Sequence, residues 1–202
     1  MNSSAYARKL SLKTPLLVTM AFFAIALPAL AALEIGDSAP EFEAKASLAG
    51  VEFVYSLRDA LDSGVVVIYF YPSAYTRGCN IQAHEFAVRM DEFTSAGASV
   101  IGVSLDNIER LNDFSADPDY CAGKLAVASD ANGAISESYD LTIREGREGM
   151  KDSRGADIDH KFAERTTFIV TPDGNIAETI GGVTPMENVQ KSLEAVQRLQ
   201  KG

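Results

Sequence analysis

The sequence predicts an α/β fold with a mixed central sheet flanked by helices and an N-terminal β-hairpin. Residues 65–71 form a continuous β-branched and aromatic run, as a strand buried on both faces requires. Segments of strand and helix character then alternate up to residue 139. Two short strands at 166–180, separated by a turn at 172–175, precede an amphipathic helix at 186–199.

The first half of the fold follows from apolar spacing and turn residues. Apolar residues alternate through 41–55 on either side of Ala49 and Gly50, which predicts a short edge hairpin. One helical turn is expected at 58–61, and Pro72 ends the strand that follows. After a polar loop, apolar residues recur at near-helical spacing up to Ala96 and Gly97, so Cys79 lies where a strand passes into a helix.

The second half repeats the alternation. The expected elements are strands at 99–105 and 125–128, helices at 108–114 and 131–139, and a hairpin of strands at 166–170 and 176–180. Residues 141–164 are polar, rich in Gly, Arg, Asp and Lys, and show little periodicity. They are therefore expected to form a long surface excursion.

Length and charge limit the classes of function. With 202 residues, of which 47% are hydrophobic, the chain is long enough for one full-sized core and too short to need a second domain. The formal net charge of −10 argues against a nucleic-acid partner, because phosphate binding needs clustered Lys and Arg.

The first 31 residues have the features of a secretory signal peptide. A basic start (Arg8, Lys9, Lys13) is followed by an uncharged apolar run at 16–27, which is shorter than the roughly 20 residues that span a bilayer. A small-x-small pattern then predicts cleavage after Ala31, with an uncleaved anchor or a fortuitous apolar start as alternatives. Cleavage would change the formal charge from −10 to −13 and leave residues 32–202 as one domain, periplasmic or secreted, without stable membrane association.

The loop after the long strand carries the most specific signal. Pro72, Thr76 and Cys79 resemble the Pro-x-x-x-Thr-x-x-Cys signature of the peroxiredoxins, the alkyl hydroperoxide reductase and thiol-specific antioxidant type. Three further segments, 35–40, 100–104 and 165–170, resemble the family's opening, middle strand and later strand in the same order. The chain looks most similar to the bacterioferritin-comigratory subgroup, and the resemblance implies a thioredoxin fold.

The chemistry of a thiol peroxidase needs the residue types found here. The thiolate, not the thiol, attacks peroxide oxygen, so the protein must stabilise negative sulfur. Unpaired backbone N–H groups in a first helical turn would favour the Cys79 thiolate, and Arg165 would add a permanent cation. Thr76 could align the peroxide through its hydroxyl, and Pro72 could shield the sulfur from water.

The resemblance implies a thiol peroxidase that reduces hydrogen peroxide and organic hydroperoxides through a sulfenic acid at Cys79, without a metal or bound cofactor. The implied partners are the hydroperoxide and a thioredoxin-like or small-thiol reductant, and the implied assembly is a monomer or homodimer. In relatives of this subgroup a resolving cysteine often lies five residues after the first, where this chain has His84. Cys121, expected near the end of a helix, remains a possible resolving cysteine, a buried structural thiol, or one half of a permanent disulfide.

Several neighbouring residues have two interpretations. Thr76 is also a good helix N-cap, and Arg165 could be an ordinary surface arginine. Arg77, which replaces a proline that many relatives carry, is better explained as a solvated side chain. Gln82 and Glu85 are candidates for orienting Arg165. A metal site built from Cys79, His84, Cys121 and His160 matches no zinc spacing.

Other redox classes fit less well. A thioredoxin-like oxidoreductase needs a Cys-x-x-Cys pair, which Asn80, Ile81 and Gln82 do not provide. Proteins similar to glutathione peroxidase typically use a tryptophan, and this chain has none. A non-enzymatic peroxide sensor or thioredoxin-fold binding module remains the alternative to an enzyme.

Overall fold

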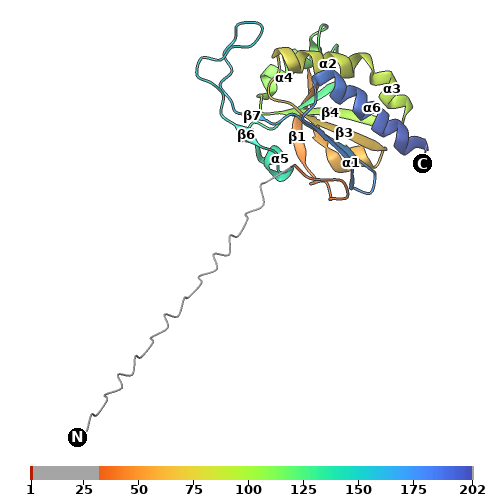
Figure 1. Cartoon of the computed structure of the whole chain (residues 1–202). Coiled ribbons are helices and arrows are strands. Elements are labelled where there is room, and N and C mark those ends of the chain that lie inside the picture. The colour runs from red at the N-terminus through yellow and green to blue at the C-terminus, as the bar shows by residue number, and fades with distance from the viewer. Residues whose placement is uncertain (2–31, 202) are drawn as a thin grey trace.

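A seven-stranded mixed sheet organises the residues described by the computed structural model, which are Met1 and 32–201 (Figure 1). The strands lie in the order β2-β1-β5-β4-β3-β8-β9, with β3, β4 and β5 parallel and the other pairings antiparallel. The strand bounds are β1 (Glu43–Leu48), β2 (Val51–Ser56), β3 (Val65–Phe70), β4 (Ala98–Ser104), β5 (Ala126–Ser129), β8 (Thr166–Val170) and β9 (Ile176–Gly181). The predicted mixed sheet and its N-terminal edge hairpin are confirmed.

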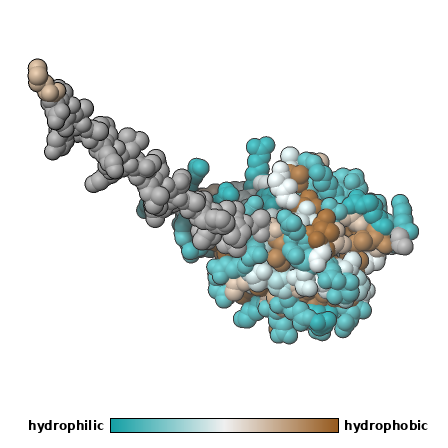
Figure 2. All heavy atoms as spheres, turned by 60° about the horizontal axis from the view of Figure 1, so that its bottom comes forward, coloured by the Kyte–Doolittle hydropathy of each residue, from teal (hydrophilic) through white to brown (hydrophobic). Residues whose placement is uncertain are grey.

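Helices cover both faces of the sheet. Their bounds are α1 (Leu57–Leu61), α2 (Arg77–Val88), α3 (Met90–Ser95), α4 (Ile108–Ala116), α5 (Ala134–Ser138) and α6 (Pro185–Lys201). Figure 1 shows α2, α3, α4 and α6 gathered on one side of the sheet, with α1 and α5 on the other. Exposed apolar side chains remain on the outside, and the face in Figure 2 is mostly hydrophilic with separate apolar areas.

The strand β3 divides the core into two layers. Val67, Tyr69 and Tyr71 belong to the apolar cluster under α2, α3, α4 and α6. Val66, Ile68 and Phe70 belong to the cluster on the opposite face, which includes Leu57 and Leu61 of α1. Side chains alternate between the faces of a strand, so a strand that is apolar at every position must be covered on both sides, as predicted.

Local sequence explains where elements begin and turn. Ala49 and Gly50 both have positive φ (52° and 79°) between paired Leu48 and Val51, which is the two-residue turn that suits the twist of a hairpin. Ser56 begins α1 by accepting a hydrogen bond from the Asp59 N–H. Asn107 does the same for the Arg110 N–H at the start of α4.

Some predicted bounds differ from the structure. The helix expected up to Gly97 is two helices, α2 and α3, which meet at Arg89, and it begins earlier than the apolar spacing indicated. The helix expected at 131–139 is only the short α5. Cys121 was expected near a helix end, but α4 stops at Ala116 and Cys121 lies in a turn. Pro118 explains why α4 does not reach Cys121, because a proline disfavours helical geometry in the residue before it.

The excursion at 141–164 is ordered against the domain rather than independent of it. It contains a two-stranded sheet of β6 (Ile143–Arg144) and β7 (Phe162–Ala163), and Figure 1 shows the loop between them extending beyond the layers. The expected signal peptide lies outside the described residues, apart from Met1. Among the described residues, no helix has the length and apolar character needed to cross a membrane.

Candidate active site

The site forms where β3 leads into α2. After β3 the chain runs through Tyr71–Thr76 and enters α2 at Arg77, so Cys79 lies in the first turn of that helix, as predicted. The Cys79 side chain is buried, with 2% of its surface exposed. Thr76 occupies the N-cap position but makes no side-chain cap bond; its hydroxyl instead donates to the carbonyl oxygen of Ser73 at 2.9 Å.

Sheet register brings Arg165 to this point from a distant part of the chain. Strand β8 runs antiparallel to β3, and Thr166 pairs with Phe70 at the end of β3. The residue before β8 therefore lies beside the loop that follows β3. Arg165 Nη2 donates to Cys79 Sγ across 3.3 Å. The structure thus brings together two residues that lie 86 positions apart in the sequence.

Buried polar side chains hold the Arg165 guanidinium in place. Its Nη1 donates to Gln82 Oε1, and Gln82 Nε2 donates to Asn188 Oδ1 at 2.9 Å. Asn188 also accepts from the Thr167 hydroxyl at 2.7 Å, and Gln82 and Asn188 are buried. Gln82 thus contacts Arg165 as anticipated, whereas Glu85 pairs with Arg89 at 3.6 Å.

Gly78 gives the guanidinium its space beside the sulfur. A Cβ atom at this position would lie 3.2 Å from Arg165 Nη2 and 3.6 Å from Pro185 Cγ. The first distance is tighter than ordinary van der Waals contact, so any larger residue would press on the guanidinium. Gly78 therefore permits the short approach of Arg165 to Cys79.

An open pocket of about 850 Å³ lies beside the site. Pro72 and Arg165 lie on its wall, together with apolar side chains of Met150, Phe162 and Val183. Part of the wall comes from the excursion at 141–164, which no sequence pattern connects with Cys79.

Cys121 is buried in the same apolar cluster as Cys79, and both are free thiols. The structure therefore contains no disulfide between them. Burial, with a smaller contribution from the charge of Asp117, raises the pKa of the Cys121 thiol well above its usual value. In this conformation Cys121 is a protonated, poorly nucleophilic thiol.

The remaining candidates lie away from the sulfur. Arg77 is exposed, in agreement with its interpretation as a solvated side chain. His84 is also exposed, and its Nδ1 contacts the carbonyl oxygen of Asp119 at 3.0 Å. His160 contacts Asp106 instead of either cysteine, and no group of three His, Cys, Asp or Glu within residues 32–201 is arranged to hold a metal ion.

Sequence reasoning missed Asp106, which fixes the loop before Cys79. Its buried carboxylate accepts from the Ala74 N–H at 2.8 Å, from the Ser73 hydroxyl at 3.0 Å and from the Ser104 hydroxyl at 2.7 Å. A signal was present: Asp106 comes just after the buried strand β4, which is parallel to β3. The carboxyl ends of neighbouring parallel strands meet at one edge, where sites commonly form.

Comparisons with known proteins agree with this geometry. A family model described as the AhpC/TSA family matches residues 35–179. A putative peroxiredoxin bcp of Helicobacter pylori strain J99 is 31% identical over 164 residues, which cover 81% of this chain and 98% of that protein. The putative peroxiredoxin YkuU of Bacillus subtilis is 31% identical over 175 residues, covering 83% of this chain and 89% of its own.

Solved structures show the same fold. Peroxidoxin BcpB from Mycobacterium tuberculosis superposes with a TM-score of 0.68 at 24% identity, over 83% of this chain and 98% of that chain. Peroxiredoxin Q of Xanthomonas campestris gives a TM-score of 0.61 at 27% identity, over 77% and 90% of the two chains. The thioredoxin fold expected from the resemblance is confirmed. The chain belongs to the AhpC/TSA family and is a peroxiredoxin of the bacterioferritin-comigratory subgroup, a thiol-dependent peroxidase.

Proposed function

We propose that this peroxidase reduces hydrogen peroxide and organic hydroperoxides with Cys79 as its nucleophile. The Cys79 thiolate attacks the terminal peroxide oxygen and the O–O bond breaks. The departing oxygen takes up a proton as water or alcohol, and the sulfur is left as a sulfenic acid. The single observation that carries the proposal is the 3.3 Å contact of Arg165 Nη2 with Cys79 Sγ at a helix start.

Two features support a stabilised thiolate. The first turn of a helix leaves backbone N–H groups without intrahelical partners and carries the positive end of the helix dipole. A hydrogen bond from a guanidinium to an anion contributes about 1.5–3 kcal/mol, more than a neutral pair. Because both act on the sulfur only when it is charged, they favour the reactive form over the thiol.

Thr76 and Pro72 complete the proposed site. Because the Thr76 hydroxyl donates to Ser73, its oxygen lone pairs remain able to accept a hydrogen bond from the peroxide, which would align the O–O bond with the sulfur. Pro72 and Arg165 both line the pocket. The apolar ring of Pro72 on this wall would limit the access of water to the thiolate.

Cys121 is the proposed resolving thiol. Its sulfur would attack the Cys79 sulfenic acid, forming the disulfide and releasing water, after which a thioredoxin-like or small-thiol reductant would restore both thiols. Because Cys121 is buried and protonated, this step requires the turn around residues 117–124 to open first. The opening must break the backbone hydrogen bonds of this turn, including those that the Lys124 and Leu125 N–H groups donate to the Cys121 carbonyl oxygen at 2.9 and 3.2 Å.

The test compares reduced wild-type protein with Cys79→Ser and Cys121→Ser during reaction with hydrogen peroxide. We expect Cys79→Ser to lose peroxide reduction, and Cys121→Ser to react at the wild-type rate in the first turnover. Intact mass after one equivalent of peroxide should fall by about 2 Da in the wild type and rise by about 16 Da in Cys121→Ser. Wild-type reactivity of Cys79→Ser would refute the nucleophile, and a persistent 16 Da gain in the wild type would refute the resolving role.

We also propose that the protein is exported and acts in the periplasm or outside the cell. The support is the basic start, the short apolar run and the Ala29-Leu30-Ala31 pattern. When the full chain is expressed, the protein should be found outside the cytoplasm with Ala32 as its first residue by N-terminal sequencing. A protein that retains Met1 in the cytoplasmic fraction would contradict the proposal.

A further inference from the structure

A buried cluster of charges joins the excursion at 141–164 to the loop before Cys79. Two carboxylates, Asp106 and Asp152, have no exposed side-chain surface. Arg110 lies between them, with Nε 2.8 Å from Asp106 Oδ1 and Nη2 2.8 Å from Asp152 Oδ2. Asp152 belongs to the excursion and Asp106 to the main sheet, so Arg110 ties the two parts together.

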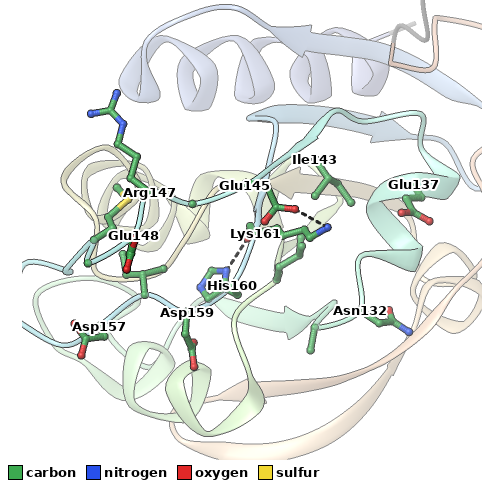
Figure 3. Close-up of a pocket in the computed structure, with 16 residues that line it drawn as sticks. Asn132, Glu137, Ile143, Glu145, Arg147, Glu148, Asp157, Asp159, His160 and Lys161 are labelled. Carbon is green, nitrogen blue, oxygen red and sulfur yellow. Dashed lines mark hydrogen bonds and ion pairs between the residues drawn. The ribbon is translucent and has the colours of Figure 1, made fainter.

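His160, near the other end of the excursion, makes a second contact with Asp106. Its Nε2 lies 2.8 Å from Asp106 Oδ1, and its Nδ1 lies 2.7 Å from the carbonyl oxygen of Lys161. A carboxylate and a carbonyl both accept hydrogen bonds, so both ring nitrogens must donate. Only the imidazolium carries two N–H groups, and the geometry therefore fits a charged His160. Figure 3 shows this ring among the side chains that line a pocket of about 810 Å³ beside the active-site pocket.

The tip of the excursion contacts the same loop. The Ser153 N–H donates to the carbonyl oxygen of Tyr75 at 2.9 Å, and the Arg154 guanidinium lies 3.2 Å from the centre of the Tyr75 ring. Tyr75 has a positive φ of 59°, which is a strained conformation for a bulky residue. Such strain persists only when surrounding contacts hold it, and here the excursion supplies several of them.

The connection reaches the substrate-aligning hydroxyl through one residue. Ser73 Oγ lies 3.2 Å from His160 Nε2 and donates to Asp106, while the carbonyl oxygen of Ser73 accepts from Thr76. We propose that His160 is a positioning residue of the peroxidase reaction. As an imidazolium it holds the loop before Cys79 so that Thr76 is correctly oriented, a role that rests on the function proposed for Cys79 and Thr76. Loss of its proton would leave an unprotonated ring nitrogen facing an acceptor and would loosen the loop.

The surroundings of His160 favour the charged ring. Burial by itself lowers the pKa of His160, but the hydrogen bond and charge of Asp106 outweigh burial and raise the pKa above its usual value. Arg110 on α4 opposes this, and Phe162 of β7 contributes a neutral edge contact at 5.6 Å between ring centres. Across the pocket wall, Lys161 pairs with Glu145, and Arg147, Glu148 and Asp159 are exposed to solvent. The surroundings thus favour the imidazolium over the neutral ring, and the imidazolium is lost as pH rises.

The first test is an NMR titration of the wild-type protein, which needs no variant to fold. The His160 ring nitrogens and the backbone amides of Ser73 and Thr76 are followed from pH 5.5 to 9. The amide shifts should move with the same midpoint as the His160 ring, above the usual histidine value of about 6.5. If the Thr76 amide does not change while His160 titrates, the proposal is overturned.

Kinetics test whether the coupling reaches the reaction. The wild-type rate constant with hydrogen peroxide should fall about three- to tenfold over the pH range in which the His160 ring loses its proton in the NMR titration. His160→Gln should lack the falling limb and react about three- to tenfold more slowly than the wild-type maximum. His84→Gln removes the chain's other histidine, which is exposed, and should keep the same fall.

The positioning role of His160 and the nucleophilic role of Cys79 can be refuted independently. A falling limb that persists in His160→Gln would refute the role of His160, even if Cys79 is the nucleophile. Cys79→Ser, by contrast, should keep the NMR coupling between His160 and Thr76 although it cannot turn over. Peroxide reduction by Cys79→Ser at the wild-type rate would refute the proposed function, while the NMR titration would still decide whether His160 positions the loop.

Discussion

Replacing Arg165 by methionine tests the contact on which the peroxidase site is built. The substitution keeps an unbranched apolar stem but removes the guanidinium that donates to Cys79 Sγ at 3.3 Å. Arg165 comes from β8 and Cys79 from α2, so the change leaves the local sequence of the cysteine loop intact. We expect Arg165→Met to slow the reaction with hydrogen peroxide without preventing folding.

The magnitude follows from the geometry. At 3.3 Å, two unit charges attract by about 5 kcal/mol at an effective dielectric constant of about 20, which is an upper bound before desolvation is counted. A net value of about 1.5–3 kcal/mol for a charge-assisted hydrogen bond is the better guide. Each 1.36 kcal/mol corresponds to a factor of ten, so the rate constant should fall about 10- to 150-fold.

The assay is stopped-flow mixing of reduced protein with excess hydrogen peroxide at pH 7, with thermal unfolding of each variant measured in parallel. Arg77→Met is the matched control, because Arg77 loses the same charge two residues from Cys79 but is exposed. It should change the rate constant by less than threefold. The reasoning is refuted if Arg165→Met is folded and reacts within threefold of the wild type, or if Arg77→Met is the slower of the two.

Three further changes test other parts of the account. Gly78→Ala should keep or raise the thermal stability, since Ala favours a helix over Gly by about 1 kcal/mol. The same variant should lower the peroxide rate constant severalfold, because its Cβ would press on Arg165. An unchanged rate constant would contradict this role of Gly78. Thr76→Val should lower the rate constant about 10- to 100-fold while Thr76→Ser retains most of it, and equal rates for the two variants would exclude a role of the hydroxyl. The pKa of His160 is raised in the folded state, so its contribution to stability is complete below about pH 6.5 and is lost as pH rises through the folded value. Urea unfolding should accordingly show a pH-dependent decrease in the free energy of unfolding that is absent in His160→Gln, and the same decrease in that variant would assign it to another group.

Much of the fold was predictable because it depends on patterns local to the chain. The buried strand β3 is apolar at every position, and the turn at Ala49 and Gly50 suits only a tight hairpin. The placement of Cys79 in a first helical turn follows from the strand, the polar loop and the helix that succeed one another there. Arg165 was found through the family resemblance, since no local pattern connects it to Cys79.

The missed features depend on contacts between distant polar residues. Residues 141–164 show no apolar periodicity because their order comes from Asp152 and His160 meeting Arg110 and Asp106, and such pairs leave no repeat in a sequence. The pairing of Gln82 with Asn188 is likewise invisible before the fold is known. The position of Cys121 in a turn, outside a helix, was predictable from the sequence, because Pro118 marks the end of α4.

Trapping of the sulfenic acid tests the central claim most directly. Reduced Cys121→Ser is mixed with one equivalent of hydrogen peroxide and a dimedone-type reagent that reacts with sulfenic acids, and the adduct is located by peptide mass spectrometry. The account predicts one adduct per chain, on the peptide that contains Cys79, formed at the rate of peroxide consumption. Peroxide consumption without an adduct on Cys79 would contradict it.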